Sequence, residues 1–410
     1  MKIFNKKTVG ILLCLSLLLT FGFNVTANEA VTVSSECDIS DINIPIDTTV
    51  TDAKIGQTLD IKAKSSILME PYTGQILYES NADEVLPPAS ITKIMSLLLV
   101  MEAIDRKDLS LDSVINASEH ACSMGGSQIW LEPNESMTVD DLLKAAFIAS
   151  ANDATVALGE AVAGSEEGFV AMMNEKAQSL GMTNTKFINC TGLDAEGHVT
   201  TAHDVAIMSC ELIKHQLVKN YSTVWMDSLR DGKSELVNTN KLVRFYKGTT
   251  GLKTGTTSGA GYCLSATAQR NGMELVAVIM GGDTSNDRFN GAKKLLDYGF
   301  ANYSFNCVKP ELKKNTTVKV EKGTEKIVKV TAKDNINILL KKSDSAKIIQ
   351  KVNLKDKVTA PVKKGDKLGS VDVYVGDEQI GSVDITAKSD IKRMNFAVAL
   401  SLIIKGLFVL

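Results

Sequence analysis

The sequence predicts a protein of the mixed α/β class, of the α+β kind: an antiparallel sheet packed by helices, followed by a small all-β domain. Strand-like segments stand at both ends of the first part of the chain, and segments with helical periodicity lie between them. After Val308, short alternating strands separated by Gly and Asp turns replace the helices. The chain has 410 residues, 44% of them hydrophobic, and this length suits two domains.

The N-terminus has the pattern of a secretory signal peptide. Three lysines fall within the first seven residues, a largely apolar run extends from Val9 to Phe23, and small residues follow at positions 25–27. The sequence therefore predicts a signal peptide over residues 1–27, with an uncleaved anchor as the alternative, and in both cases export from the cytoplasm. Residues 28–60, which are polar, acidic and rich in Ser and Thr, are typical of a linker.

Cysteine and histidine usage indicates no metal centre. Six cysteines follow the signal peptide, at wide and irregular spacings. An even count in an exported protein permits disulfides, and the spacing equally suits small buried thiols, so both readings stay open. No Cys-x-x-Cys pair is present and the four histidines lack zinc-ligand spacing, so the sequence implies no metal.

The charge is unevenly distributed along the chain. From Lys309 to Arg393 there are 20 Lys and Arg against 12 Asp and Glu, whereas the formal net charge of the whole chain is −3. An acidic body is therefore joined to a basic C-terminal part. In an exported protein this does not favour nucleic acid as a partner. It suits either an anionic membrane surface or an ordinary lysine-rich sheet face.

Residues 61–305 are predicted to form the first folded domain. From Ser90 to Ala103 apolar residues recur at three- and four-residue steps on nearly all faces, which predicts a helix buried in the domain centre. Pro87 and Pro88 stop the chain just before it. The other expected elements are strands at 66–69 and 76–78, helices at 139–148, 153–162 and 168–180, and strands at 251–255, 262–268 and 275–280, with a tight turn at Asn271-Gly272.

Residues 306–388 are predicted to form the β-rich domain, with half-buried strands that carry lysine on the outside. The expected strands are at 318–320, 326–330, 336–338, 358–360 and 371–374. The tail over 392–410 is apolar from Phe396 onward, apart from Ser401 and Lys405. Fifteen helical residues reach about 22 Å, less than a membrane core of roughly 30 Å, so we expect an amphipathic helix in the membrane interface. A short helix buried against the β domain is the alternative.

Ser90 and Lys93 form the first of three short motifs that carry chemistry. In Ser90-Ile91-Thr92-Lys93 a hydroxyl and an amine stand three residues apart, on one face of the predicted buried helix. A lysine on so apolar a helix is costly unless it is paired or neutral, and a neutral amine can take a proton from serine. Taken alone, Ser90 could equally be a helix N-cap.

Ser150-Ala151-Asn152 and Lys253-Thr254-Gly255 are the other two motifs, within about 165 residues of Ser90. Ser150 can relay a proton and Asn152 can hold an amide. Lys253 and Thr254 offer a positive charge and a hydroxyl suited to a carboxylate, and Gly255 lets another backbone or a ligand approach the strand. Taken alone, the first motif is a polar turn between helices and the second an exposed edge strand.

With these motifs the chain resembles the serine-type D-alanyl-D-alanine carboxypeptidases, the low-molecular-mass penicillin-binding proteins. The likeness covers about Ser65 to Tyr303, and the β-rich domain and tail share the layout of that family. It implies the penicillin-recognising serine-transferase fold. Further stretches that carry the resemblance are Trp130-Leu131-Glu132-Pro133, Asn152-Asp153-Ala154, Leu180-Gly181-Met182-Thr183-Asn184-Thr185, Thr191-Gly192-Leu193-Asp194, Thr201-Ala202-His203-Asp204, Asn238-Thr239-Asn240 and Gly261-Tyr262.

The resemblance implies catalytic roles for residues of the first two motifs. Ser90 would form the acyl-enzyme, Lys93 would be its base, and Ser150 and Asn152 would complete the proton path. The oxyanion hole would be the backbone N–H groups of Ser90 and Thr256.

The substrate-binding set implied by the resemblance is Lys253, Thr254, Gly255, Thr256 and Arg288. Arg288 stands where such enzymes carry an arginine near the terminal carboxylate of the substrate, with a surface salt bridge as its alternative role. The implied partners are peptidoglycan stem peptides and β-lactam antibiotics, at the outer face of the cytoplasmic membrane in the cell-wall compartment. No cofactor is implied.

Two other functions share the same motifs. A class A-like β-lactamase needs a glutamate on a loop that normally reads Glu-x-x-Leu-Asn, and no such string lies between Asn152 and Lys253. An inactive penicillin-recognising sensor or scaffold would not need Ser90, Lys93 and Ser150 together. The sequence therefore favours removal of the last D-alanine from peptidoglycan pentapeptide stems, with penicillin as a covalent inhibitor.

Overall fold

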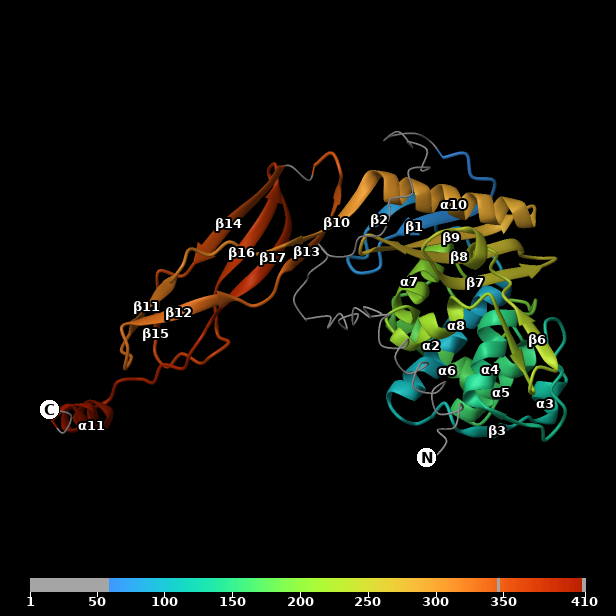
Figure 1. Ribbon diagram of the computed structural model, residues 1–410, viewed down its shortest axis with the longest axis horizontal. Coiled ribbons are helices and arrows are strands. Elements are labelled where there is room, and N and C mark those ends of the chain that lie inside the picture. Colours follow the sequence, from blue (N-terminus) through green and yellow to red (C-terminus); the bar gives the residue numbers. More distant parts are fainter. Residues whose placement is uncertain (1–58, 345–346, 408–410) are drawn as a thin grey trace, which may run out of the picture. The chain divides into compact units, whose positions relative to one another are not determined.

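The computed structural model describes residues 59–344 and 347–407, so the predicted signal peptide and most of the predicted linker lie outside the described residues. The first domain is built on a five-stranded antiparallel sheet (Figure 1). Its strands, in spatial order, are β2 (Ile76–Ser80), β1 (Ser65–Met69), β9 (Met273–Gly282), β8 (Gly261–Arg270) and β7 (Thr249–Thr257). Strand β7 is therefore an edge of this sheet, and only β8 pairs with it.

Helices cover both faces of the sheet. Helix α10 (Ser285–Asn302) packs on one face against β9, β8 and β1, and α7 (Ala202–Leu212) packs on the other (Figure 1). Helix α2 (Lys93–Asp105) contacts α7, and ten of its 13 residues are buried. Because α2 is apolar on nearly all sides, it forms the centre of the helical part, as the sequence predicted.

The rest of the described first domain consists of further helices and two short ladders. It comprises α3 (Glu119–Cys122), α4 (Val139–Lys144), the π-helix η2 (Ala145–Ala149), α5 (Asn152–Ala163), α6 (Glu166–Ser179), the 3₁₀ helix η3 (Gln216–Val218), α8 (Lys219–Ser222) and α9 (Leu242–Phe245). Two small antiparallel ladders complete it, β3 (Val114–Asn116) with β4 (Ser136–Thr138) and β5 (Met226–Leu229) with β6 (Ser234–Val237).

The structure departs from the sequence prediction at both expected site helices. The segment expected to begin as an α-helix at Ser90 opens as a 3₁₀ turn, η1 (Ala89–Thr92), and α2 starts at Lys93. The helix expected over 139–148 changes from α4 to the π-helix η2, which carries one extra residue in its turn. Helices α7 and α10 and the hairpin of β5 and β6 were not expected at all.

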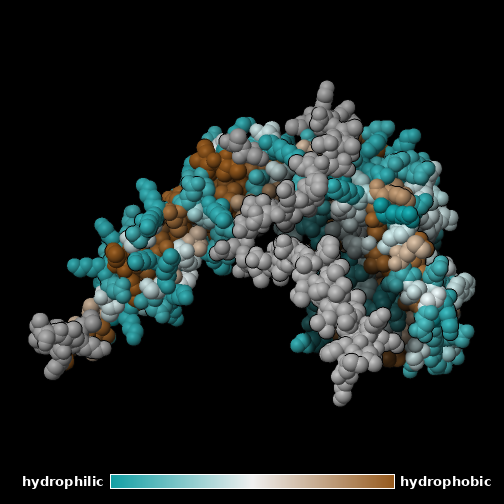
Figure 2. All heavy atoms as spheres, viewed as in Figure 1, coloured by the Kyte–Doolittle hydropathy of each residue, from teal (hydrophilic) through white to brown (hydrophobic). Residues whose placement is uncertain are grey.

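The C-terminal domain is all-β, as predicted. A six-stranded sheet has the order β14 (Ile348–Leu354), β16 (Lys367–Val375), β17 (Glu378–Ala387), β12 (Ile327–Ala332), β11 (Thr317–Glu321) and β15 (Lys357–Thr359), and β10 (Tyr303–Val308) pairs with β13 (Ile336–Lys341). On β11 the buried Val318 and Val320 alternate with the exposed Lys319, and many hydrophilic side chains are visible on this domain (Figure 2).

The tail forms helix α11 (Phe396–Leu407), on which Phe396, Leu400 and Ile404 are exposed. Among the described residues no helix is both long and apolar enough to cross a bilayer. Of the cysteines, Cys122, Cys190, Cys210 and Cys263 carry free thiols, and the last three are buried. This favours the reading of these positions as small core residues.

Candidate active site

The candidate nucleophile lies on the turn η1, immediately after two prolines. Ala89, the residue before Ser90, has a φ of +49°, a left-handed conformation that non-glycine residues rarely adopt. This bend places Ser90 on the turn just before the buried helix α2 and leaves its side chain partly accessible. Strain of this kind persists only where the surroundings hold it, and it gathers at functional sites.

Lys93 is fully buried and uses all of its hydrogen-bonding capacity. As an ammonium, its Nζ donates to Ser90 Oγ at 3.1 Å, to Asn152 Oδ1 at 2.6 Å and to the Thr191 carbonyl oxygen at 2.7 Å. These partners are a hydroxyl and two carbonyl-type oxygens, none of which is a carboxylate. Two of them cannot donate a proton, so a neutral amine directs its two N–H bonds at them and its lone pair at the Ser90 hydroxyl.

Burial lowers the pKa of Lys93 from 10.5 to about 7, although electrostatic interactions with Cys190 and Asp153 oppose the shift. The neutral fraction of the amine therefore rises as the pH rises through about 7. At neutral pH a large share of the molecules carries a free base 3.1 Å from the Ser90 hydroxyl. This is the geometry of an activated serine nucleophile.

Ser150 lies at the end of the π-helix η2 in the left-handed conformation, with φ of +63°, and is 4% exposed. The backbone N–H of Ala151 donates to the Ala145 carbonyl oxygen and closes the widened turn. Asn152 then begins α5. π-Helical turns are rare and frequently occur at functional sites, because the extra residue redirects the side chains that follow it.

Asn152 is fixed on both sides of its amide. Its Oδ1 accepts from Lys93, and its Nδ2 donates to the Gly125 carbonyl oxygen at 2.6 Å. A Cβ at Gly126 would lie only 2.8 Å from that Nδ2, so the close approach of this loop requires glycine there. The Ser150-Ala151-Asn152 motif is thereby held against Lys93.

Two glycines allow neighbouring backbone segments to pack directly against the Ser90 turn. A Cβ at Gly255 of β7 would lie 2.9 Å from the Ser90 backbone nitrogen. A Cβ at Gly192, which has a φ of +87°, would lie 1.8 Å from the Ala89 carbonyl oxygen. Both positions therefore need glycine, which lets strand β7 and the Thr191-Gly192 loop touch the nucleophile backbone.

Lys253 is the second buried amine of the site, at 1% exposure. Burial lowers its pKa well below the usual value, and the positive charges of Lys93 and Arg288 add to this effect. Its Nζ donates to the Thr254 carbonyl oxygen at 3.3 Å. The Arg288 guanidinium and two amines that can each gain a proton thus lie near the end of β7, an arrangement that favours an incoming anion.

Thr254 joins the third motif to the second. Its Oγ1 donates to Thr239 Oγ1 at 2.7 Å, and the backbone N–H of Thr239 donates to the Ile148 carbonyl oxygen of η2. The 238–240 segment therefore bridges the helix that precedes Ser150 and the strand that carries Lys253. In the sequence this segment carries only a resemblance to the family, and no local pattern marks Thr239 as a site residue.

Arg288 on α10 contacts β7 and β8 and is 8% exposed. Its Nη1 donates to the Gly255 carbonyl oxygen at 3.0 Å, to Thr256 Oγ1 at 2.9 Å and to the Cys263 carbonyl oxygen at 3.3 Å. The salt-bridge alternative considered for Arg288 does not describe these contacts, because all three acceptors are neutral. The guanidinium supports the end of the third motif.

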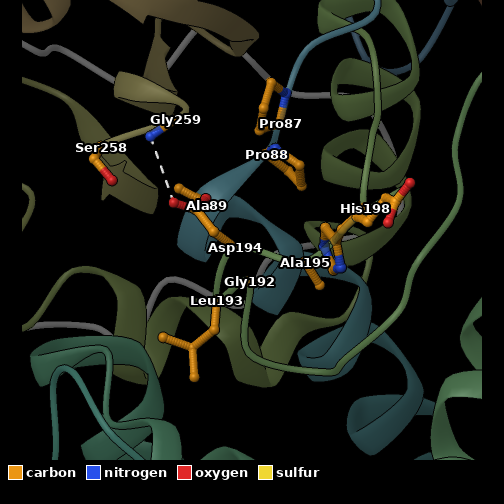
Figure 3. A pocket seen from close by; sticks show the side chains of 11 residues that line it. Pro87, Pro88, Ala89, Gly192, Leu193, Asp194, Ala195, His198, Ser258 and Gly259 are labelled. Carbon is orange, nitrogen blue, oxygen red and sulfur yellow. Dashed lines mark hydrogen bonds between the residues drawn. The ribbon is translucent and has the colours of Figure 1, made fainter.

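Beside the nucleophile turn lies a pocket whose lining includes Ala89, Gly192, Asp194, His198 and Gly259 (Figure 3). The Gly259 backbone N–H donates to Asp194 Oδ2 at 3.4 Å, drawn as the dashed line. Neither His198 nor the Thr191 carbonyl oxygen is predicted from the sequence to belong to the site. A backbone acceptor and a histidine about 100 residues from Ser90 carry no local pattern that would have revealed them.

Comparison with protein families gives two matches that together span most of the chain. Residues 50–284 match the family model described as D-alanyl-D-alanine carboxypeptidase, and residues 308–393 match the C-terminal domain of penicillin-binding protein 5. The first match covers more than half of the chain. The chain belongs to the D-alanyl-D-alanine carboxypeptidase family.

Individual family members are similar to this chain over most of their length. The D-alanyl-D-alanine carboxypeptidase DacF of Bacillus subtilis is 44% identical over 352 residues, which cover 84% of this chain and 90% of DacF. The crystal structure of penicillin-binding protein 5 from Haemophilus influenzae has a TM-score of 0.72 and 30% identity, and the match covers 82% of this chain and 99% of that one.

A third match includes a bound β-lactam. Penicillin-binding protein D2 from Listeria monocytogenes, in its ampicillin-bound form, has a TM-score of 0.55 and 33% identity, and the match covers 60% of this chain and 100% of that one. The fold predicted from the sequence, including the family to which it belongs, is therefore confirmed.

The contact of Gly192 with the nucleophile turn predicts a specific mutational effect. In Gly192→Ala the new Cβ cannot coexist with the Ala89 carbonyl oxygen, so the Ser90 turn must move. A displacement of about 1 Å can cost roughly 100-fold in rate, and we expect covalent labelling by a fluorescent penicillin to slow at least about tenfold.

Gly197→Ala is the matched control, because Gly197 also has a positive φ, +77°, but nothing lies within 4 Å of its Cβ position. It should label at close to the wild-type rate and show only a modest loss of thermal stability. Equal labelling rates for the two variants would contradict the assigned contact.

Proposed function

We propose that the chain is a serine-type D-alanyl-D-alanine carboxypeptidase that removes the terminal D-alanine from peptidoglycan pentapeptide stems through an acyl-enzyme on Ser90. The observation that carries this proposal is the buried Lys93 amine, 3.1 Å from the Ser90 hydroxyl, with a pKa of about 7. Family membership supports the reaction class, and the names of the relatives supply the substrate.

Acylation begins when neutral Lys93 takes the Ser90 proton and Ser90 Oγ attacks the carbonyl carbon of the penultimate D-alanine. The negative charge that develops on the carbonyl oxygen is stabilised by the backbone N–H groups of Ser90 and Thr256. The close packing of Gly255 on the Ser90 nitrogen brings these two residues together. The proton then passes through the side chain of Ser150 to the departing amine of D-alanine.

The terminal carboxylate of the substrate binds at the cationic end of β7. Burial and two like charges hold the pKa of Lys253 down, and an incoming carboxylate favours its charged form, so binding is coupled to proton uptake at this amine. Thr254 and Thr256 offer hydroxyls at the same edge of the sheet. Arg288 contributes positive charge and holds Thr256 in place.

Deacylation separates a carboxypeptidase from a β-lactamase. After D-alanine leaves, water attacks the ester and releases the tetrapeptide product. A penicillin instead leaves its opened ring attached to Ser90, and rapid hydrolysis of that ester requires a second base. The missing Glu-x-x-Leu-Asn loop therefore favours a long-lived penicilloyl ester. The sensor alternative lacks support, since the Ser90 and Lys93 geometry is intact.

A Ser90→Ala variant tests the assignment. Wild-type protein should release D-alanine from an acyl-D-alanyl-D-alanine peptide and form a stable adduct with a fluorescent penicillin. The variant should lose both activities, because it lacks the attacking oxygen. Ser209→Ala, which removes a buried hydroxyl that donates to the Val205 carbonyl oxygen on α7, is the control and should keep both activities.

Each alternative has its own outcome in these assays. Rapid loss of the label from wild-type protein would support a β-lactamase, and labelling without D-alanine release would support a sensor. Persistent labelling of Ser90→Ala would contradict the assignment of the nucleophile.

We propose further that this activity lies outside the cytoplasm. A signal peptide over residues 1–27 would export the protein, and the tail over 392–410 would hold it at the outer face of the cytoplasmic membrane. Support for the tail comes from the exposed Phe396, Leu400 and Ile404 on α11.

Deletion of residues 396–410 should release active protein into the soluble fraction, measured by fractionation and penicillin labelling. The full-length chain should remain with the membranes in the same experiment. A truncated protein that still sediments with membranes would contradict the tail proposal.

A further inference from the structure

A chain of three hydrogen bonds ends on the residue before the nucleophile. The backbone N–H of Ile188 donates to His198 Nδ1 at 3.0 Å. His198 Nε2 and Thr92 Oγ1 lie 2.8 Å apart, and Thr92 Oγ1 donates to the Ala89 carbonyl oxygen at 2.9 Å. The side chains of Thr92 and His198 are both buried, at 0% and 3% exposure.

The direction of every bond in this chain is fixed by its first donor. Because a backbone N–H can only donate, His198 Nδ1 must be the acceptor, and the neutral imidazole carries its proton on Nε2. Nε2–H therefore donates to Thr92 Oγ1, which leaves the single hydroxyl proton of Thr92 for the Ala89 carbonyl oxygen. We call this series the Ile188–His198–Thr92 relay.

The relay requires an uncharged imidazole. A second proton on Nδ1 would point at the Ile188 N–H and break the first bond. Burial lowers the pKa of His198 to about 4, although the charge of Asp194 opposes the shift. The edge-on ring of Phe187, with its centroid 5.9 Å away, fills the space beside the imidazole.

The Ala89 carbonyl oxygen is also confined from another side. Gly192 packs so closely on it that a Cβ there would lie 1.8 Å away. The carbonyl is therefore held between the Thr92 hydroxyl and the Gly192 backbone. Ala89 needs this support, because its φ of +49° is a strained conformation for a residue with a side chain.

The Ala89 carbonyl and the Ser90 N–H belong to one planar trans peptide group and point in opposite directions. Fixing the carbonyl oxygen therefore fixes the direction of the Ser90 N–H. We propose that Thr92 and His198 are positioning residues that aim the Ser90 N–H at the developing oxyanion. This inference rests on the proposed acyl-enzyme function, because only a reaction at Ser90 uses that N–H as an oxyanion donor.

The test is Thr92→Val, which keeps the shape of the side chain and removes the hydroxyl. Loss of an oxyanion donor costs about 100- to 1,000-fold, and a misdirected donor should cost less, so we expect acylation by a fluorescent penicillin to slow about 10- to 100-fold. The loss should fall on the acylation rate constant, with initial binding of the penicillin within about threefold of wild type.

Infrared spectroscopy of the penicilloyl-enzyme gives a readout that a merely structural role would not move. With a ¹³C-labelled ester carbonyl, a misdirected N–H polarises the bond less, so the carbonyl band of Thr92→Val should shift to higher wavenumber than in wild type. Thr92→Ser retains the hydroxyl and should restore both the rate and the band position.

Two further variants keep the experiment decisive. His198→Phe removes the donor to Thr92 and should give a smaller shift in the same direction, which carries the test if Thr92→Val does not fold. Ser209→Ala is the matched control, since Ser209 is a buried hydroxyl that donates to the Val205 carbonyl oxygen on α7. It should leave the rate and the band unchanged.

Wild-type protein provides the internal reference. If it acylates, and Thr92→Val and His198→Phe then match it in rate and band position, the relay proposal is wrong while the proposed function stands. Equal losses in Thr92→Val and Thr92→Ser would also overturn it, since the hydroxyl would not be the cause. A wild-type protein that forms no acyl-enzyme would overturn the proposed function, and the relay with it.

Discussion

The buried Lys93 amine is the constraint on which the rest of the site depends. An ammonium in the apolar centre of a domain is costly, and here its partners are a serine hydroxyl and two carbonyl-type oxygens with no full charge of their own. The neutral amine is therefore favoured, and a neutral amine beside a serine is a base. Asn152 and the Thr191 carbonyl, which come from two separate segments, leave its lone pair only one direction, toward Ser90. The burial that makes Lys93 part of the core therefore also favours the neutral form of its amine, which is the form that can act as a base.

Close backbone contact is the second device that assembles the site. Gly126, Gly192 and Gly255 stand where a Cβ would collide with Asn152, with the Ala89 carbonyl or with the Ser90 nitrogen. Because backbone groups are shorter and stiffer than side chains, contacts of this kind fix positions that side-chain packing alone leaves loose. The edge position of β7 completes the arrangement, since one side of this strand pairs with β8 and the other side meets the turn that carries Ser90.

Much of this arrangement is predictable from the sequence. The contacts that could not be predicted were missed for physical reasons. The three-residue spacing of Ser90 and Lys93 on an apolar helix indicates both burial and a base, and Gly255 in a strand indicates close approach. The residues that hold the site in place leave no such trace. The Thr191 carbonyl could belong to any residue, Thr239 is a hydroxyl in a loop, and His198 reaches Thr92 across 106 residues. Helix α10 was missed because polar residues and two glycines interrupt its apolar face, which only the sheet beneath it makes stable.

Measuring the pKa of Lys93 tests most directly whether this amine is the base that activates Ser90. A protein labelled with ¹³C at lysine Cε, with the Lys93 resonance assigned by its loss in Lys93→Arg, reports the protonation of this amine as the pH is changed. We expect a titration midpoint at about 7, with the ammonium below this pH and the free base above it. A midpoint near the ordinary lysine value of about 10.4 would show that Lys93 is charged at neutral pH and is not the base that activates Ser90.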